Sequence, residues 1–457
     1  MLFLFLLLAC QSSMNRSAWL QDQLYLDNRI WLQRDPELLS EKFRKMSEHS
    51  YHFMRGTVPL YYADLLRIEP TKAQTAFLST PESMAIPLYG DPHPENSSVL
   101  MRSDGSFDVE FVDLDSATYG PWIFDLRRLA TALRLLALQL EGCEQACEDE
   151  LVQAALRGMK QAHHNEPFNF EDSKIWRDYL DEAEEEGQER KKFEKYTRLG
   201  DDGHRVILVD ETLDEDGEGL LGLSQQAYLQ VERLSQRFAR KHGLEGFRML
   251  DAARKYGTGI SSRPAIRYVI LWDNGDTDDQ DDVLTQFREI LDAPDIASQA
   301  YDNLSFFDNN ADRINQFEQE LWQNPQADPY HHGFWDDGHG FKSVSWSSWI
   351  QDIERDKLIE DWDEGDYGLE EMVELSESLG WIMGRQHTRS TSATGQPSHL
   401  IVQADIQEGG GWARLEAEIV QASFDDAVRY QNDFELFQDL LQQKGELLGF
   451  EKMEGVP

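Results

Sequence analysis

Two neighbouring stretches, LYGDPHPENSSVL at residues 88–100 and VEFVDLDSATYGPWIFDLRRLATAL at residues 109–133, decide the fold of this chain. In the first, Asp91 lies five residues before Asn96 in a loop rich in proline. Residues 107–114 alternate between apolar and polar side chains, which is typical of a β-strand, and Asp113 lies near the end of this segment. Residues 124–140 are apolar at helical spacing, so we expect a buried helix there.

This order of aspartate and asparagine residues fits phosphoryl transfer. One aspartate, Asp91, would orient or deprotonate an acceptor hydroxyl, while Asn96 on the same loop and Asp113 on the next strand would hold a metal ion. Asp115 is a further candidate ligand, and oxygen ligands suit Mg²⁺. We expect His93 to brace the loop rather than act as a base. Alternatively, Asp91 and Asn96 only cap a tight turn, and the later aspartates only end a strand.

Outward from these stretches, the chain divides into further helical and strand-like segments. Residues 17–70 read as helices broken around 53–59, and residues 165–220 as a solvated helix and loop. Residues 267–272 and 283–290 predict a hairpin around the acidic loop 273–282, for which a solvated turn is favoured over a calcium site because the EF-hand spacing fails. From residue 369 onward the pattern is again helical.

Residues 88–133 resemble the catalytic and metal-binding segments of aminoglycoside and choline phosphotransferases, in which an aspartate like Asp125 anchors the loop. From about residue 27 to 441 the chain resembles the bacterial domain of unknown function 2252 family, whose name implies no activity. Besides the two stretches, the similar pieces are KFRKMSEHSYHFMRG at 42–56, YYADL at 61–65, DAARKYGTGISSR at 251–263, LTQFREI at 284–290, GWIMGRQHTRS at 380–390 and FDDAVRYQNDF at 424–434.

The order of these pieces differs from that in ordinary kinases, where a glycine-rich hairpin, a strand lysine and a helix glutamate come before the catalytic loop. Here the turn with Gly257 and Gly259, and the strand with Arg288, come after it. We therefore hypothesise a circularly permuted protein kinase-like α+β fold, with a large helical lobe and a small β-rich nucleotide lobe. The expected divisions are a helical lobe with the catalytic and metal loops at 17–250, a nucleotide-type lobe at 251–355, and C-terminal helices completing the helical lobe at 356–457.

The kinase resemblance implies ATP and Mg²⁺ as cofactors, with Gly257, Gly259 and Arg288 contacting phosphates and an unidentified small molecule or protein as the acceptor. The chain departs from the family pattern at Arg288, where a lysine is usual, and the planar guanidinium does not replace a compact ammonium. Arg263 and Pro264 also follow the glycine turn in place of a smooth strand. The alternative function is therefore a catalytically inactive, pseudokinase-like binding protein anchored in the envelope.

The composition limits the kinds of molecule that this protein can bind. With 85 acidic against 43 basic residues, the formal net charge is −42, which argues against nucleic acid because phosphate backbones require clustered lysine and arginine. The chain is nevertheless 40% hydrophobic and contains 12 Trp and 23 Phe, enough apolar surface for a globular core rather than a disordered acidic chain. Its 457 residues suggest two or three lobes.

The first ten residues, MLFLFLLLAC, form an apolar run too short to span a bilayer and placed like the core of a signal peptide. Its last residues resemble the bacterial lipobox, which implies lipidation of Cys10 and a cell-envelope location in which only this lipid touches the membrane. No Lys or Arg precedes the run, unlike the pattern. A mis-assigned start codon explains this, and so does an ordinary hydrophobic N-terminus of a cytoplasmic protein.

Three other features remain open in the sequence. Cys143 and Cys147 either pair in an oxidising compartment or are two small residues at a helix end. Arg385 and Arg389 are expected to form ion pairs rather than contact an anion, with His387 packed inside. The run HHGFWDDGHG at 331–340 is interpreted as a polar loop rather than a metal site, because its spacing fits no helix or strand face.

Overall fold

The structure is a computed structural model, and it describes residues 15–65, 75–78, 80–102, 104–200, 204–214, 217–244, 246–273, 282–293, 306–336 and 338–450. Cys10 and most of the acidic loop 273–282 therefore lie outside the described residues. The chain is a mixed α+β protein with a helical lobe and β-sheets. Among the described residues, none of the helices combines the length and apolarity needed to cross a membrane.

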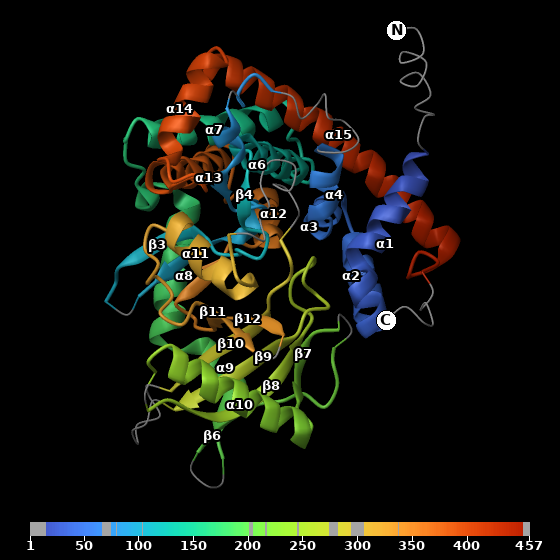
Figure 1. Ribbon diagram of the computed structural model, residues 1–457, viewed down its shortest axis with the longest axis vertical. Helices are drawn as coiled ribbons and strands as arrows, with labels where there is room; N and C mark the ends of the chain where they lie inside the picture. Colours follow the sequence, from blue (N-terminus) through green and yellow to red (C-terminus); the bar gives the residue numbers. More distant parts are fainter. Residues whose placement is uncertain are drawn as a thin grey trace. The chain divides into compact units, whose positions relative to one another are not determined.

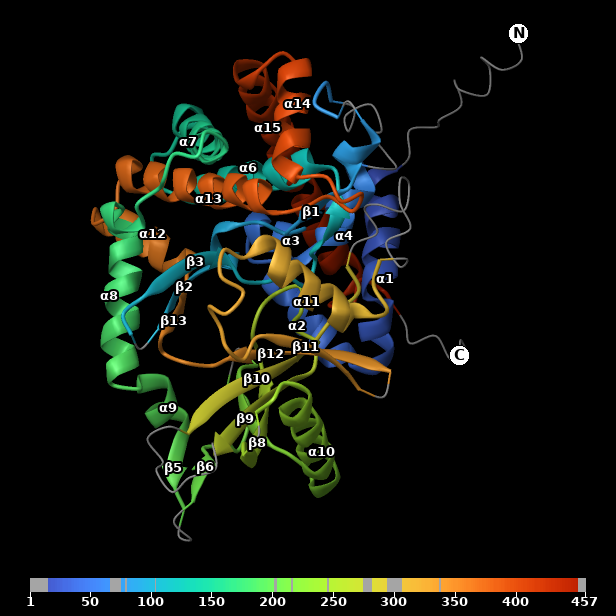
Figure 2. The ribbon, with the colours of Figure 1, turned by 60° about the vertical axis from the view of Figure 1, so that its left-hand side comes forward.

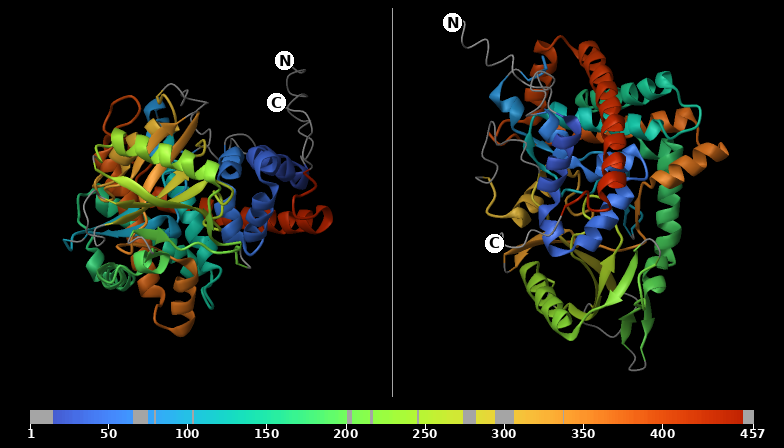
Figure 3. Two further views of the ribbon diagram at one scale, coloured as in Figure 1. Left: turned by 90° about the horizontal axis from the view of Figure 1, so that it is seen from below. Right: turned by 90° about the vertical axis from the view of Figure 1, so that its right-hand side faces the viewer.

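The chain divides into two compact units, the first made of Met1–Asp64, Gly259–Pro264 and Val428–Pro457. Its helices are α1 (Arg16–Arg34), α2 (Pro36–Met46), α3 (Ser50–Gly56), α4 (Val58–Ala63) and the C-terminal part of α15 (Trp412–Lys444). Figure 3 shows the four blue helices beside this red part of α15, where Phe43 and Phe53 pack against Phe437. The guanidinium of Arg16 bonds to both Asp64 and Asp433. The helices expected at 17–70 are confirmed as far as the described residues reach, at residue 65, with a break at Thr57 between α3 and α4.

The second unit contains a six-stranded antiparallel sheet in the order β11-β12-β10-β9-β8-β7. The strands are β7 (Gly219–Gly222), β8 (Arg248–Tyr256), β9 (Arg267–Asp273), β10 (Val283–Glu289), β11 (His332–Asp336) and β12 (His339–Ser345), drawn in yellow-green to orange in Figure 1. Pairing of β9 with β10 confirms the expected hairpin. The polar loop expected at 331–340 is wrong: this run forms most of the β11–β12 hairpin, because Phe334 and Phe341 pair across it and stack in the core.

Each face of this sheet is covered, as the alternation along β9 requires. On one face Ile270 and Trp272 pack with Phe238 of α10 (Gln225–Lys241). On the other face Val269 and Leu271 pack with Phe193 of α9 (Lys191–Tyr196) and with the small hairpin of β5 (Thr197–Leu199) and β6 (Arg205–Ile207). Figure 2 shows α10 and the α9–β5–β6 segment on either side of the sheet.

The solvated helix and loop expected at 165–220 are only partly correct, because the main helix of this segment is solvated on one face alone. Its main helix, α8 (Lys174–Gln188), exposes a charged face but buries Ile175, Trp176, Tyr179 and Leu180 on the other. Two short strands follow, β5 (Thr197–Leu199) and β6 (Arg205–Ile207). The many charged residues in this stretch obscured the pattern of an amphipathic helix.

The helical lobe of the second unit surrounds α6 (Trp122–Ala137), in which every residue is buried. This confirms the buried helix expected at 124–140 as far as Ala137, where the helix ends. Its other helices are α7 (Gln145–His163), α11 (Asn310–Leu321), α12 (Arg355–Glu364), α13 (Leu369–Arg389) and α14 (Ser398–Glu408). Helices α7 and α13 approach closely because Gly158 and Gly380 lack side chains: a Cβ on either would lie 1.8 Å from a carbonyl oxygen of the other helix.

Two short sheets carry the polar loops. Strands β1 (Ile86–Leu88) and β4 (Thr118–Gly120) pair with each other, and β3 (Phe107–Phe111), β2 (Ser97–Met101) and β13 (Ile350–Asp352) form a three-stranded sheet. Near the start of α7, Cys143 and Cys147 form a disulfide, so the first of the two alternatives for this pair holds in the structure.

Candidate functional site

A carboxylate of α6 fixes the loop that follows β1. The carboxylate of Asp125 accepts the backbone N–H of Tyr89 at 2.6 Å and that of Gly90 at 3.0 Å. Gly90 has φ +80°, and a Cβ there would lie 2.0 Å from the carbonyl oxygen of Ser116, so the turn requires glycine. Burial raises the pKa of Asp125 to about 7, against the two N–H bonds that lower it. Asp125 thus anchors the start of the loop.

Asp91 follows this anchor and is held by a buried arginine. Arg128 of α6 donates from Nε to Oδ1 of Asp91 at 2.7 Å and also pairs with it through Nη2. The buried ring of His93 lies on the other side, with Nε2 3.8 Å from Oδ2 of Asp91. The side-chain amide of Asn96 donates to the backbone carbonyl of Asp91 at 2.8 Å. One compact loop therefore carries the carboxylate and the amide at fixed relative positions.

The β2–β3 pairing brings Asn96 beside the second group of carboxylates. The backbone N–H of Val112 donates to the carbonyl of Asn96 at 2.8 Å, one step beyond the Ser97–Phe111 register pair. Asp113 is therefore the next residue along from the partner of Asn96. Because the Nδ2 of Asn96 is used by Asp91, the Oδ1 of Asn96 is its atom suited to bind a cation.

The two aspartates after β3 share a buried lysine. Nζ of Lys342, from the middle of β12, lies 2.9 Å from Oδ1 of Asp113 and 2.9 Å from Oδ1 of Asp115. Burial alone would raise the pKa of Asp113, but the charges of Lys342 and Arg288 hold it below its ordinary value. The pKa of Asp115 is raised instead, by burial and by the neighbouring charge of Asp113. Asp113 is therefore the carboxylate best kept ionised for a cation.

A pocket of about 290 Å³ opens next to this cluster. Val112 and Leu100 line it from the β2–β3 hairpin, and Arg288 and Val344 line it from the six-stranded sheet. Thr258, in the turn after β8, also lines it. The preceding Gly257 has φ +85°, and a Cβ there would lie 2.5 Å from the backbone of Glu218, so this turn also depends on glycine.

The structure thus brings most of the predicted site residues together. The loop of Asp91 and Asn96 adjoins Asp113 and Asp115, while Arg288 and the turn of Gly257 meet at the pocket beside them. Gly259, with φ +77°, belongs to the first compact unit rather than to the unit that contains the pocket.

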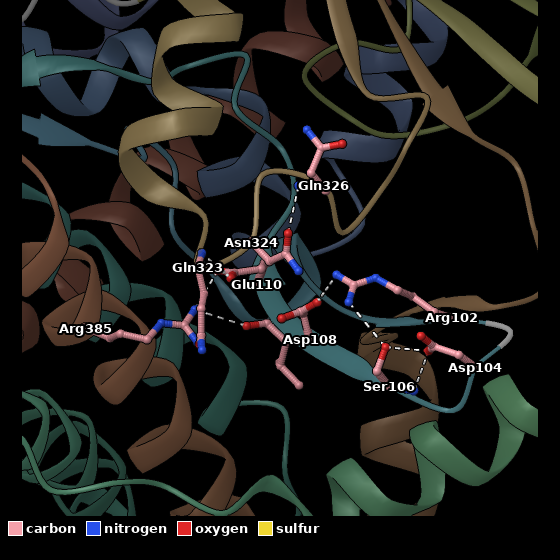
Figure 4. Close-up of polar contacts among 10 residues, drawn as sticks. Arg102, Asp104, Ser106, Asp108, Glu110, Gln323, Asn324, Gln326 and Arg385 are labelled. Carbon is pink, nitrogen blue, oxygen red and sulfur yellow. Dashed lines mark hydrogen bonds and ion pairs between the residues drawn. The ribbon is translucent and has the colours of Figure 1, made fainter. Parts of the chain in front are cut away.

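A second polar network holds the β2–β3 hairpin (Figure 4). Glu110 of β3 accepts from Arg385 of α13 at 2.6 Å and from the backbone N–H of Gln323 at 2.6 Å. Arg385 also donates to the side-chain carbonyl of Gln323, and Arg102 pairs with Asp108 nearer the hairpin tip. Arg385 therefore forms the expected ion pair, and His387 is buried beside His163.

Sequence reasoning missed three lysines that the fold brings to this region, namely Lys342, Lys255 and Lys192. Lys255 and Lys192 line the pocket, and Lys342 holds the two aspartates. Lys342 has little local signal, because apolar and polar residues do not alternate strictly in its segment FKSVS, residues 341–345. Nothing in the charged sequence around Lys192 indicates that this residue lines a pocket.

Fold and site together define an α+β protein in which a β-sheet pocket adjoins a loop of aspartate and asparagine. The chain belongs to a family described as "uncharacterized protein conserved in bacteria" (DUF2252), whose family model matches residues 34–440. A search of curated proteins and a search of solved structures each gave no match.

Proposed function

We propose that this protein is a kinase-like phosphotransferase that binds ATP and Mg²⁺ and transfers the terminal phosphoryl group to a hydroxyl of an unidentified acceptor. The observation that carries the proposal is the placement of Asn96 beside Asp113, with Arg288 close enough to lower the pKa of Asp113. Kinase active sites require this combination of an amide and a carboxylate for metal with a cation for phosphate.

In the proposed reaction, Asp91 accepts the proton of the acceptor hydroxyl while the hydroxyl oxygen bonds to the terminal phosphorus of ATP. The bond between that phosphorus and its bridging oxygen breaks, and ADP leaves. Arg128 keeps the Asp91 carboxylate oriented, and Asp125 holds the backbone that positions it. Asn96 and Asp113 would hold Mg²⁺, with Asp115 as a further ligand. The ion would neutralise charge on the phosphate oxygens when bound. Arg288 and the Gly257 turn would contact those phosphates.

The fold we propose is a circularly permuted kinase-like one, with the six-stranded sheet as the nucleotide lobe. Two features support it. The turn after β8 contributes Thr258 to the same pocket as Val112, the residue before Asp113. Asp125 also holds the loop that carries Asp91 through two backbone N–H groups, the role that the phosphotransferase resemblance implies.

A second candidate is a catalytically inactive binding protein that uses the same pocket. In active kinases the strand lysine pairs with a glutamate of a neighbouring helix. Here Arg288, the residue that the resemblance places at that lysine, donates to Gln286 at 3.2 Å, and Glu318 of α11 bonds to His331 at 2.9 Å. Either function would be carried out in the bacterial envelope if Cys10 is lipidated, and metabolic labelling with a fatty acid, comparing wild type with Cys10→Ser, tests that location.

The test of the proposed reaction is turnover of ATP with and without Mg²⁺, using water or the protein's own hydroxyl groups as acceptor. We expect Asp91→Asn and Asp113→Asn each to abolish Mg²⁺-dependent turnover. Asp104→Asn is the matched control, since Asp104 is exposed at the tip of the same β2–β3 hairpin. Turnover that is unchanged in Asp113→Asn would remove the proposed metal role. Binding without turnover in wild type would favour the inactive binding protein.

A further inference from the structure

The pocket beside Asp113 concentrates positive charge in a chain whose overall charge is strongly negative. Lys192 of α9, Lys255 of β8 and Arg288 of β10 all line it, each from a different element. Arg267 of β9 lies close behind, since its charge lowers the pKa of Lys255. Four cations from four separate segments thus meet at one place.

These pocket cations contact neutral groups rather than carboxylates. Lys192 donates to the carbonyl of Ser347 at 3.3 Å, Lys255 lies 4.6 Å from the centre of the Trp346 ring, and Arg288 donates to Gln286 at 3.2 Å. Within the described part of the chain, none of the three forms an ion pair within 4.0 Å. By contrast, the neighbouring Lys191 pairs with Glu186 at the surface.

Two carboxylates also line the pocket, and both accept hydrogen bonds from other groups. Asp328 accepts from the backbone N–H groups of Ser345 and Tyr330, at 2.8 Å and 3.0 Å. Asp352 accepts from the hydroxyl of Ser98, and its charge acts to raise the pKa of both Lys192 and Lys255. This charge offsets the repulsion among the cations only in part, because burial and the charges of Arg267, Arg288 and Lys192 still lower the pKa of Lys255 to about 7. A multiply charged anion would relieve this repulsion.

We infer that the pocket formed by Lys192, Lys255 and Arg288 binds a chain of two or more linked phosphate groups directly, without needing a metal ion. This inference rests on the proposed function, which treats the pocket as the phosphate-binding part of the nucleotide site. It goes further by naming linked phosphate groups as the ligand that the pocket selects. Several cations on different elements match several phosphate groups along a chain, whereas one orthophosphate can meet only part of the set.

The phosphate chain belongs either to a nucleotide or to inorganic polyphosphate. The neighbouring pocket bears on this choice, because only a nucleotide carries a base that could occupy it. A second pocket of about 730 Å³ shares Ser345, Trp346 and Ile350 with the first, so the two pockets lie next to each other. Phe193, Tyr330 and Trp349 also line this second pocket. Aromatic side chains of this kind can stack on a nucleobase.

Isothermal titration of the full chain in EDTA tests the inference with orthophosphate, pyrophosphate, tripolyphosphate and ATP. We expect tripolyphosphate to bind at least about tenfold more tightly than orthophosphate, a difference of about 1.4 kcal/mol. We expect the double variant Lys192→Gln, Lys255→Gln to weaken tripolyphosphate binding by about tenfold or more. The matched control Lys191→Gln removes a charge next to Lys192 in sequence but outside the pocket, and should leave binding unchanged.

Equal binding of ortho- and tripolyphosphate, or unchanged binding in the double variant, would overturn the inference. If the double variant does not fold, the wild-type comparison still decides, together with weaker tripolyphosphate binding at high NaCl. ATP binding more tightly than tripolyphosphate supports a nucleotide as the source, and equal binding supports an inorganic chain. Asp113→Asn separates the two proposals: it should keep binding in EDTA but lose Mg²⁺-dependent turnover. Polyphosphate binding in EDTA without any turnover would refute only the proposed function.

Discussion

Lys342 places its ammonium 2.9 Å from the carboxylate of Asp113, although the two residues lie 229 positions apart in the chain. Both side chains belong to elements that meet at the candidate site: β12 of the six-stranded sheet and the end of the β2–β3 hairpin. The same ammonium serves Asp115. This contact therefore joins the sheet to the loop that carries the proposed chemistry.

Replacing Lys342 by methionine should destabilise the protein by about 1 to 3 kcal/mol, because two partly buried carboxylates lose their shared counter-charge. Unfolding in urea measures this change. Lys174→Met is the control, since Lys174 is well exposed and its pair with Asp178 should contribute about 0.5 kcal/mol or less. Adding Asp113→Asn to Lys342→Met should recover part of the loss. A stability within about 0.5 kcal/mol of wild type for Lys342→Met would contradict the contact.

The anchored turn at Gly90 predicts a large effect for a small substitution. Gly90→Ala places a Cβ 2.0 Å from the carbonyl of Ser116, in addition to the strain at φ +80°. Gly105 has nearly the same φ, +81°, but a Cβ there meets nothing within 4 Å. Gly105→Ala should therefore cost only about 1 to 2 kcal/mol, the backbone strain alone. Urea unfolding should show Gly90→Ala to be clearly less stable, and equal losses in the two variants would show that the loop is not held against Ser116.

Glu110 predicts a pH dependence of stability. Burial raises its pKa to about 7, with Arg385 opposing this, whereas an unfolded glutamate titrates near about 4.3. A raised pKa means that the folded state holds the proton more tightly, so this contribution is complete below about pH 4.3 and is lost as the pH rises through about 7. The decrease in urea midpoint between pH 5 and pH 8 should therefore be smaller in Glu110→Gln than in wild type. An identical decrease in both proteins would exclude this role for Glu110.

The disulfide between Cys143 and Cys147 predicts how many free thiols the protein has before and after reduction. Titration of the denatured protein should find two more thiols after reduction than before. Since the closed loop is short, replacing both cysteines by serine should cost only about 2 kcal/mol in the chain-entropy account. Equal thiol counts before and after reduction in protein isolated under oxidising conditions would show that the pair does not form.

How far the sequence predicts this structure depends on how local each signal is. The helix of residues 124–140 and the hairpin around residues 273–282 follow from apolar periodicity, which lies within one segment. The anchoring of the loop by Asp125 was also predictable, because the motif places it at a fixed distance after Asp91.

The remaining parts of the site depend on contacts between distant segments. Lys342 lies beside HHGFWDDGHG, where histidine, aspartate and glycine obscure the alternation of a strand hairpin, so neither the strand nor its lysine was predicted. Lys192 and Lys255 sit in charged sequence that also suits a solvated surface. Only the folded sheet shows that these cations line one pocket.

The thermal stability of wild type and Asp113→Asn with ATP, in the presence of Mg²⁺ or of EDTA, is the sharpest test of the proposed nucleotide and metal site. We expect Mg²⁺ to add to the stabilisation by ATP in wild type, because a ligand that binds only the folded state raises the unfolding temperature. We expect Asp113→Asn to keep the stabilisation seen in EDTA and to lose the part that Mg²⁺ adds. The absence of any Mg²⁺-dependent stabilisation of wild type by a nucleoside triphosphate would contradict this site.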